Sequence, residues 1–257
     1  MKGLKGKVAL VTGGGSGIGK AICLRLAESG VKIGVLDIDE NAARNTAEAI
    51  GYFNEQSAFS SSDISDYQGT IRAVESLEKE IGQADILVNC AGWDKVTAFK
   101  DTEESYRDKV IDINLKGHIN ITHIVVKGMV ERGAGRVITI SSDGGRIGSS
   151  GQAVYSACKA GLFAFSKTLA REYARNGVTF NVVCPGPTKS RMMDEALSGD
   201  DNGSAVRILK KIIKSVPLGR IGEPEDVAGM VAFFASDEAS FITGQVISVS
   251  GGLTMVG

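Results

Sequence analysis

The sequence predicts a single-domain α/β protein in which a doubly wound, parallel β-sheet carries helices on both faces. Three observations predict this fold class. Short β-branched segments alternate with longer segments of helical periodicity, the short segments lack a regular alternation of polar and apolar residues, and a glycine-rich turn links the first of them to a helix. Since strands buried on both faces need no polar face, the short segments are typical of a parallel sheet between two helix layers.

Six β-branched segments, each bounded by turn-forming or polar residues, are the expected strands. They cover residues 7–12, 32–37, 85–89, 136–141, 178–184 and 245–250. A seventh segment at 57–62 gives a weaker strand pattern because it has little apolar content. Helical patterns that begin at Gly19, Asp66 and Ala153 lie between strands. Strands and helices that alternate in this order form βαβ units, whose strands run parallel.

The composition restricts the class of protein. The 257 residues include 29 Lys and Arg against 30 Asp and Glu, and the net charge of −1 gives no reason to bind nucleic acid. No segment approaches the roughly 18 apolar residues of a membrane span, and the first residues lack the apolar run and cleavage site of a signal peptide. We therefore expect a cytoplasmic protein of one domain, residues 1–257, with no membrane or nucleic-acid partner.

Neither the cysteines nor the histidines have the spacing of a metal site. His118 and His123 are five residues apart, off a common helical face, and no Cys or carboxylate cluster joins them. The cysteines are far apart, lack CxxC spacing and are expected to be reduced thiols; they are Cys23, Cys90, Cys158 and Cys184. The sequence therefore predicts no structural metal.

The first expected strand runs directly into the glycine-rich turn TGGGSGIG, residues 12–19, and then into a helix. Glycines let the backbone approach a pyrophosphate closely, and a helix N-terminus offers free amides and a positive dipole end to the anion. The spacing differs from GxGxxG, and a turn that only packs strand against helix would also be glycine-rich. The predicted phosphate-binding residues are Gly13, Ser16, Gly17, Ile18 and Gly19.

An acidic residue closes the second expected strand. Asp37 lies 24 residues after Gly13, where a carboxylate can accept hydrogen bonds from the hydroxyls of an adenine ribose. The same carboxylate would repel a 2′-phosphate, and Ser16, Ile38 and Asp39 supply no cation to bind one. We therefore predict NAD rather than NADP as the cofactor, with a turn or helix-capping acid as the alternative role of Asp37.

Tyr155 and Lys159 stand four residues apart on a segment of helical pattern, so their side chains emerge from one face of the helix. A phenol with its ordinary pKa of about 10 is a poor base near neutral pH. An ammonium group close by favours the phenolate, so Lys159 is expected to lower the pKa of Tyr155 and equip it for acid–base catalysis. A Tyr and a Lys four residues apart also occur on ordinary solvated helix faces. The other motifs in the sequence must therefore decide whether this pair is catalytic.

Ser142 follows the strand expected at 136–141, at a carboxyl end where the ligands of open α/β sheets bind. Its hydroxyl is placed to hydrogen-bond a substrate oxygen while Tyr155 gives or takes the proton. No Gly-x-Ser-x-Gly turn surrounds Ser142 and no catalytic histidine accompanies it, which disfavours a hydrolase. A turn or capping serine is the alternative.

Taken together, motifs along nearly the whole chain resemble those of the short-chain dehydrogenase/reductase family. They are TGGGSGIG, Asp63, NCAG at 89–92, Asn114, Ser142, YSACK at 155–159 and PGPT at 185–188. The resemblance implies a Rossmann-like domain with a sheet of about seven strands, usually assembled as a homotetramer, that oxidises alcohols or reduces carbonyls with a nicotinamide cofactor. The family's NNAG reads NCAG here, a small departure at Cys90.

The resemblance also implies roles for individual residues. Tyr155 matches the acid–base residue, Lys159 the ribose-binding partner, Ser142 the substrate-orienting hydroxyl, and Asn114 the residue that supports a proton-relay water. A helix-interior packing amide is the alternative for Asn114. Residues that would contact the cofactor are Asp63 and Ile64 at the adenine, Asn89 and Gly92 near the ribose, and Pro185, Gly186 and Thr188 at the nicotinamide.

The substrate is less well determined by the sequence. Trp93 and Gln152 could line an alicyclic pocket or could be packing residues. An irregular segment at 186–217 follows a strand end and is a candidate substrate lid. Its basic residues could meet CoA phosphates or belong to a solvated amphipathic helix, because nearby acids offset them; they are Lys189, Arg191, Arg207, Lys210, Lys211 and Lys214.

The expected function is NAD-dependent hydride transfer between a secondary alcohol and a ketone, with an alicyclic 2-hydroxyacyl-CoA as one candidate substrate. A 3-ketoacyl-thioester reductase is a second enzyme hypothesis. A dinucleotide-binding sensor without catalysis belongs to another class, which the intact Ser142, Tyr155, Lys159 and Asn114 disfavour. The fold alone does not select the substrate.

Overall fold

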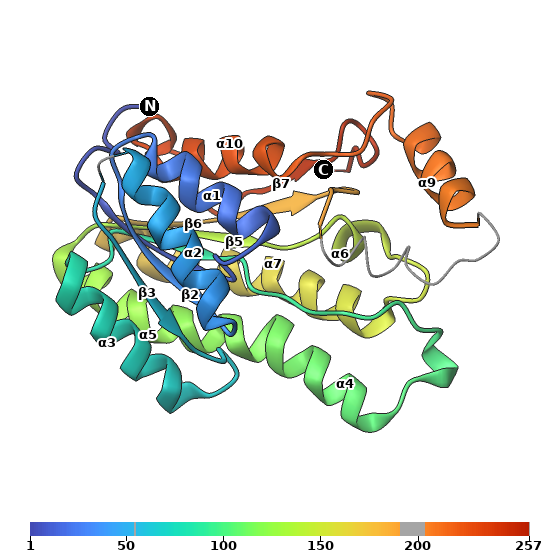
Figure 1. Ribbon diagram of the computed structural model, residues 1–257, viewed down its shortest axis with the longest axis horizontal. Coiled ribbons are helices and arrows are strands. Elements are labelled where there is room, and N and C mark those ends of the chain that lie inside the picture. The colour runs from blue at the N-terminus through green and yellow to red at the C-terminus, as the bar shows by residue number, and fades with distance from the viewer. Residues whose placement is uncertain (54, 191–203, 257) are drawn as a thin grey trace.

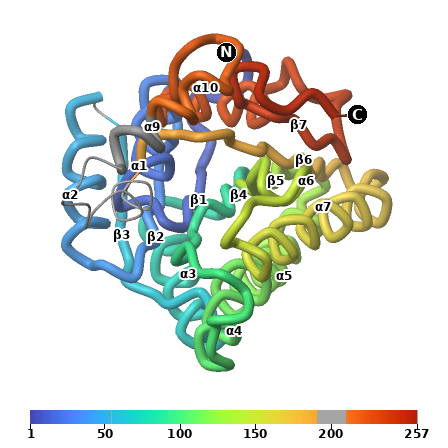
Figure 2. Tube along the Cα trace, turned by 90° about the vertical axis from the view of Figure 1, so that its right-hand side faces the viewer, coloured from blue at the N-terminus to red at the C-terminus, as the bar shows by residue number. Residues whose placement is uncertain are grey.

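Seven parallel strands form one continuous sheet in the computed structural model, which describes residues 1–53, 55–190 and 204–256 (Figure 1). The strand order is β3-β2-β1-β4-β5-β6-β7, and Figure 2 shows the sheet between two layers of helices. The strands are β1 (Val8–Thr12), β2 (Lys32–Asp37), β3 (Ser57–Ser61), β4 (Ile86–Asn89), β5 (Gly135–Ile140), β6 (Val178–Pro185) and β7 (Val246–Val249). The predicted fold class is confirmed.

Helices cover both faces of the sheet. One face packs against α1 (Gly17–Ala27), α2 (Glu40–Ile50) and α10 (Pro224–Ala235), and the opposite face against α3 (Tyr67–Ile81), α5 (Gly117–Arg132) and α7 (Ala153–Tyr173). The remaining described elements are α4 (Glu104–Ile111), α6 (Gly144–Ile147), α9 (Ser204–Ser215), the 3₁₀ turns η1 (Gly51–Phe53), η2 (Phe99–Asp101), η4 (Ala174–Asn176) and η5 (Asp237–Ala239), and the π-helical turn η3 (Asp112–Lys116).

Burial on both faces explains the missing polar alternation in the strands. Within β1, Val8 and Leu10 point into the core under α3 and α5, whereas Ala9 and Val11 point into the core under α1 and α10. All five residues of β1 are buried. Because successive side chains of a strand face opposite sides, a strand between two helix layers must be apolar throughout.

The weakest predicted strand forms at the edge of the sheet. β3 pairs in parallel with β2 alone, with Val35 opposite Phe59, and Ala58 is its one buried residue. An edge strand is held by backbone hydrogen bonds on one side and needs little apolar content, which accounts for the serines in this segment.

The strand order reverses direction between β1 and β4, so the sheet has a topological switch point there. Ligands of doubly wound sheets bind beyond the carboxyl ends of the strands at this point. The glycine-rich turn follows β1, the Asn89–Trp93 segment follows β4, and Ser142 follows β5. The topology therefore brings three predicted site segments to one edge of the sheet.

The predicted lid lies partly outside the described residues, which leave out 191–203 and therefore Arg191. Of the rest, residues 186–190 follow β6, and α9 spans Ser204–Ser215. In the portion of the chain that the structure describes, no helix is both long enough and apolar enough to cross a membrane.

Candidate active site

The glycine-rich turn is fastened to the segment that follows β4. Thr12 Oγ1 accepts hydrogen bonds from the backbone N–H of Cys90 (3.0 Å) and of Ala91 (3.2 Å). Gly13 has a φ of +65°, and a Cβ built there would lie 2.8 Å from Ala91 Cα. Only glycine fits this close approach, so the requirement for Gly13 comes from packing of the two segments.

The start of α1 fits a bound pyrophosphate. Ser16 is the N-cap of α1 but makes no side-chain capping bond, so it leaves the first amides of the helix without that partner. A Cβ at Gly17 would meet no atom within 4 Å, so the space beside the helix start is open, whereas a Cβ at Gly19 would lie 2.0 Å from Gly13 O. Amides without a side-chain cap beside open space suit an anion.

Asp37 lies beside this turn, as the prediction for a ribose-binding acid requires. Its Oδ2 accepts a hydrogen bond from Gly15 N at 2.9 Å, and its Oδ1 accepts one from Asp39 N at 3.0 Å. Each carboxylate oxygen can accept a further bond, so ribose hydroxyls can still be recognised. Asp37 therefore also holds the shape of the glycine-rich turn, a contact that the sequence prediction did not include.

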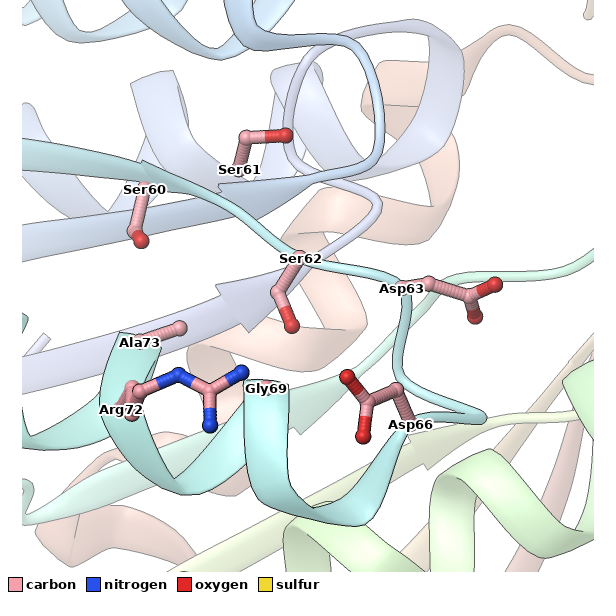
Figure 3. A pocket seen from close by; sticks show the side chains of 8 residues that line it. All are labelled: Ser60, Ser61, Ser62, Asp63, Asp66, Gly69, Arg72 and Ala73. Atoms are coloured by element: carbon pink, nitrogen blue, oxygen red, sulfur yellow. The ribbon is translucent and has the colours of Figure 1, made fainter.

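Asp63 and Ile64 follow β3 at the far side of the same sheet edge. Asp63 Oδ1 accepts hydrogen bonds from the backbone N–H and the hydroxyl of Ser65, and Ile64 is buried against Gly117. Asp63 borders a polar cavity of about 360 Å³ beside the start of α3, into which Ser62, Asp66 and Arg72 point (Figure 3). This cavity lies at the β3 edge of the sheet, far from β5 and Tyr155.

Asn89 and Gly92 hold the segment after β4 close to the predicted catalytic residues. Asn89 Nδ2 donates to Thr122 Oγ1 at 2.8 Å, and the buried Asn89 Oδ1 has no partner in the structure. A Cβ at Gly92 would lie 3.1 Å from Asn114 Oδ1 and 3.5 Å from Lys159 Nζ. The absence of a side chain at Gly92 thus keeps the backbone next to both polar groups.

Tyr155, Lys159 and Ser142 come together as predicted. Lys159 Nζ lies 5.5 Å from the centre of the Tyr155 ring and donates a hydrogen bond to Ile140 O at 3.2 Å. The Ser142 side chain lies within hydrogen-bonding reach of the Tyr155 hydroxyl and lowers its pKa, and Ser142 Oγ accepts from Gly144 N at 3.0 Å. Tyr155 is 9% exposed and Lys159 is 2% exposed, so both side chains have little contact with solvent.

Burial governs the acidity of this set. It raises the pKa of Tyr155 well above its usual value; the charge of Asp94 adds to the rise, and the Ser142 hydrogen bond opposes it. Burial also lowers the pKa of Lys159 to about 8. In the cofactor-free chain the net shift of the Tyr155 pKa is therefore upward, because loss of solvent disfavours the phenolate. That Lys159 lowers this pKa stays a prediction.

Asn114 lies in the π-helical turn η3 and is completely buried. Its Nδ2 donates to Trp93 O (2.6 Å) and Val110 O (2.9 Å), and its Oδ1 accepts from Trp93 N (3.3 Å). The amide therefore clamps the backbone of the segment after β4. A π-helical turn is uncommon but frequent at functional sites, and here its Asn114 amide joins Val110 of α4 to the Trp93 segment.

Trp93 and Gln152 both lie beside Tyr155, although through different contacts. Trp93 packs against the cluster of Val110, Tyr155 and Cys158, and Lys109 Nζ sits 4.1 Å from its ring centre. Gln152, three residues before Tyr155, donates from Nε2 to the carboxylate of Asp94 at 2.9 Å. The structure thus brings both predicted substrate residues to the site.

Pro185, Gly186 and Thr188 extend the site along the end of β6. Gly186 N donates to Val249 O at 3.0 Å, and Thr188 Oγ1 donates to Gly186 O at 3.0 Å. Asp143 N donates to Pro185 O, so this segment is tied to the residue after Ser142.

Two buried polar residues of the site, His118 and Asp94, escaped the sequence prediction. His118 Nε2 lies 2.7 Å from Ala91 O, and burial lowers the pKa of its ring to about 3, so the neutral ring donates to that carbonyl. Asp94 is 5% exposed, and Tyr106 donates its hydroxyl to Asp94 Oδ1 at 2.7 Å. Asp94 follows the NCAG motif by only two residues, and this proximity could have identified it in the sequence as a site residue.

These arrangements define the class of protein: an oxidoreductase that works with a dinucleotide bound across the switch point of its sheet. A family model described as Enoyl-(Acyl carrier protein) reductase matches residues 13–254. The chain belongs to the short-chain dehydrogenase/reductase family, whose members use a nicotinamide dinucleotide.

Curated relatives cover nearly the whole chain. It is 38% identical over 251 residues to an acetoacetyl-CoA reductase of Allochromatium vinosum, covering 97% of this chain and 99% of the relative. It is 40% identical to an acetoacetyl-CoA reductase of Rhizobium meliloti, over 96% of this chain and 98% of the relative. It is 38% identical to the 3-oxoacyl-[acyl-carrier-protein] reductase FabG of Salmonella typhimurium, over 98% of this chain and 99% of the relative. Among solved structures, levodione reductase matches with a TM-score of 0.92 at 29% identity, covering 96% of this chain and 97% of that one.

Proposed function

We propose that the protein is a 3-ketoacyl-thioester reductase, which converts the ketone of the acyl chain to a secondary alcohol. The observation that carries the proposal is the buried Tyr155 hydroxyl, held by Ser142 at the end of β5 and flanked by Lys159. The names of the relatives, acetoacetyl-CoA reductase and 3-oxoacyl-[acyl-carrier-protein] reductase, support the thioester class.

The acidity of Tyr155 supports the reductive direction. A phenol whose pKa is raised by burial keeps its proton near neutral pH, so Tyr155 is suited to give a proton to the oxygen of a ketone as that oxygen gains charge. Ser142 donates a second hydrogen bond to the same oxygen and orients it. The bound nicotinamide supplies the hydride.

Two further residues organise this chemistry. Lys159, anchored on Ile140 O, would bind ribose hydroxyls of the cofactor and bring positive charge near Tyr155. Asn114 fixes the Trp93 backbone beside Gly92 and would support a water that replaces the proton on Tyr155. Both assignments follow the family resemblance and the contacts described above.

For the cofactor we propose NAD(H). The Asp37 carboxylate lies beside the glycine-rich turn and makes no ion pair with any described side chain, so its charge is free to repel a 2′-phosphate. Arg44, the nearest described cation along α2, is paired with Glu40 at 2.7 Å. Parallel kinetics with NADH and NADPH test this proposal, and equal efficiency with both would contradict it.

For the substrate we propose a CoA thioester. The exposed Lys210, Lys211 and Lys214 of α9 offer positive charge beyond the end of β6, whereas Lys189 is paired with Glu223 at 2.5 Å. Segments such as NCAGWD and RIGSSGQAVYSACK also resemble 2-hydroxycyclohexane-1-carboxyl-CoA dehydrogenase, so oxidation of an alicyclic 2-hydroxyacyl-CoA is the second candidate reaction. Of the lid predicted at 186–217, the described parts, residues 186–190 and α9, would border either substrate.

The deciding experiment compares substrates and directions with purified protein. Acetoacetyl-CoA, free acetoacetate, an acetoacetyl-carrier protein and an alicyclic 2-hydroxyacyl-CoA are assayed with both cofactors. Reduction of acetoacetyl-CoA with NADH, at far higher kcat/KM than the free acid, is the expected result. Turnover of the alicyclic alcohol alone would favour the second candidate, and no turnover in the panel would refute both. We further propose that the protein is a cytoplasmic homotetramer, and light scattering on the same sample tests the tetramer.

A further inference from the structure

A buried carboxylate lies beside Tyr155 without a cation to pair with it. Asp94 is 5% exposed, and none of the ion pairs in the described chain includes it. Its two oxygens are held by neutral donors instead, Oδ1 by the Tyr106 hydroxyl at 2.7 Å and Oδ2 by Gln152 Nε2 at 2.9 Å. Because a buried carboxylate without a cation is costly, a role beyond packing is expected for it.

The first consequence concerns the orientation of Gln152. An ionised carboxylate only accepts hydrogen bonds, so the amide of Gln152 must turn its Nε2 toward Asp94. One N–H of Nε2 and the carbonyl Oε1 then have no hydrogen-bond partner among the described residues. A thioester carbonyl oxygen is an acceptor, and the free N–H is the group that can bind it.

The second consequence concerns charge. Asp94 acts on groups from two elements packed beside its segment, Tyr106 of α4 and both Tyr155 and Cys158 of α7. Its negative charge adds to the rise in the pKa of Tyr155 and, with burial, raises that of Tyr106 to about 12. It therefore opposes formation of a second negative charge at the site.

We propose that Asp94 is a positioning residue which fixes the Gln152 amide with its free N–H toward the thioester carbonyl and holds a buried negative charge next to Tyr155. The first half rests on the proposed function, and the second half does not. Asp94 thereby links the substrate-binding group and the proton donor through one buried carboxylate.

The variant Asp94→Asn tests both halves because the shape is kept and the charge is lost. An asparagine can present either its oxygen or its NH₂ to Gln152, so the amide is free to flip. We expect the KM for acetoacetyl-CoA to rise about tenfold, the loss of one hydrogen bond, with a smaller change in kcat. We expect the titration of Tyr155 to move to lower pH, because a negative charge near the phenolate is removed.

Three variants separate this role from a structural one. Asp108→Asn removes an exposed carboxylate from the same region and should change neither KM nor the titration. Gln152→Ala should raise KM like Asp94→Asn but leave the titration in place. The double variant Asp94→Asn/Gln152→Ala should raise KM no further than either single change, because both act through one contact.

Tyr155 is titrated without substrate, from the tyrosinate absorbance of each variant minus that of the same variant carrying Tyr155→Phe. If the unmodified protein reduces no thioester, the proposed function fails while this titration still tests Asp94. An unchanged titration in Asp94→Asn overturns the electrostatic half. Multiplicative effects on KM in the double variant, or an unchanged KM in Gln152→Ala, overturn the positioning half. If Asp94→Asn does not fold, the KM of Gln152→Ala still tests the positioning half of the proposal.

Discussion

Replacing Tyr155 with Phe removes one hydroxyl and leaves the rest of the site in place. The ring is buried against Val110 and Cys158, and a phenylalanine ring fills the same space. Only the hydrogen bond to Ser142 is lost. We therefore expect the free energy of unfolding to change by about 1 kcal/mol and the affinity for NADH to stay nearly constant.

The expected loss of activity is far larger, because no described side chain can replace the phenol. Lys159 Nζ is turned to Ile140 O, and the Asn114 amide is used by Trp93 and Val110. General acid catalysis contributes about 10²- to 10⁴-fold, so we expect kcat to fall by about 10³-fold or more, which corresponds to about 4 kcal/mol of barrier.

The assay follows NADH absorbance with saturating acetoacetyl-CoA, beside a fluorescence titration of NADH binding. A kcat in Tyr155→Phe above about a tenth of the unmodified value would show that another group supplies the proton. Loss of NADH binding together with activity would show instead that the hydroxyl organises the site, and either result would refute the assignment of Tyr155 as the proton donor.

Three further predictions follow from other contacts. The pKa of His118 is lowered from 6.5 to about 3, so the stability it contributes is present above pH 6.5 and is lost as pH falls toward 3. The free energy of unfolding, measured with a denaturant, should therefore fall by about 2 kcal/mol from pH 7 to pH 5. The variant His118→Gln should not show this fall, and an equal pH dependence in both proteins would contradict the prediction. Asp37→Ala should raise the Kd for NADH about tenfold or more, since ribose contacts and the Gly15 bond are both lost; an unchanged Kd in calorimetry would rule the contact out. Gly19→Ala would place a Cβ 2.0 Å from Gly13 O and should abolish NADH binding or folding, whereas Gly51→Ala, in open space at a φ of −56°, should be neutral in thermal unfolding and binding; normal binding by Gly19→Ala would disprove the packing argument.

The sequence carries the parts of the fold that depend on local pattern. β1, β2 and β6 were predictable because each is apolar on both faces, and the glycine-rich turn because its close approach tolerates no side chain at Gly13 or Gly19. The spacing of Tyr155 and Lys159 placed both on one face of α7. Their meeting with Ser142 followed from the parallel topology, which gathers strand ends at one edge.

Other features depend on contacts that no local pattern records. Asp94 and His118 look like surface residues in sequence, and their burial results from packing of the segment after β4 against α4 and α5. The π-helical turn around Asn114 likewise depends on the hydrogen bonds of its amide to Trp93, which lies 21 residues away along the chain. Polar residues of this kind are placed by tertiary structure alone.

The acidity of Tyr155 shows why proximity in sequence was not enough. A nearby cation lowers the pKa of a phenol, but burial adds an opposing desolvation cost, and here Tyr155 and Lys159 are both almost fully buried. Burial penalises the phenolate and the ammonium alike, so it raises the pKa of Tyr155 and lowers that of Lys159 to about 8. The cofactor-free site therefore favours a protonated phenol, and a protonated phenol is the form that gives its proton to a ketone.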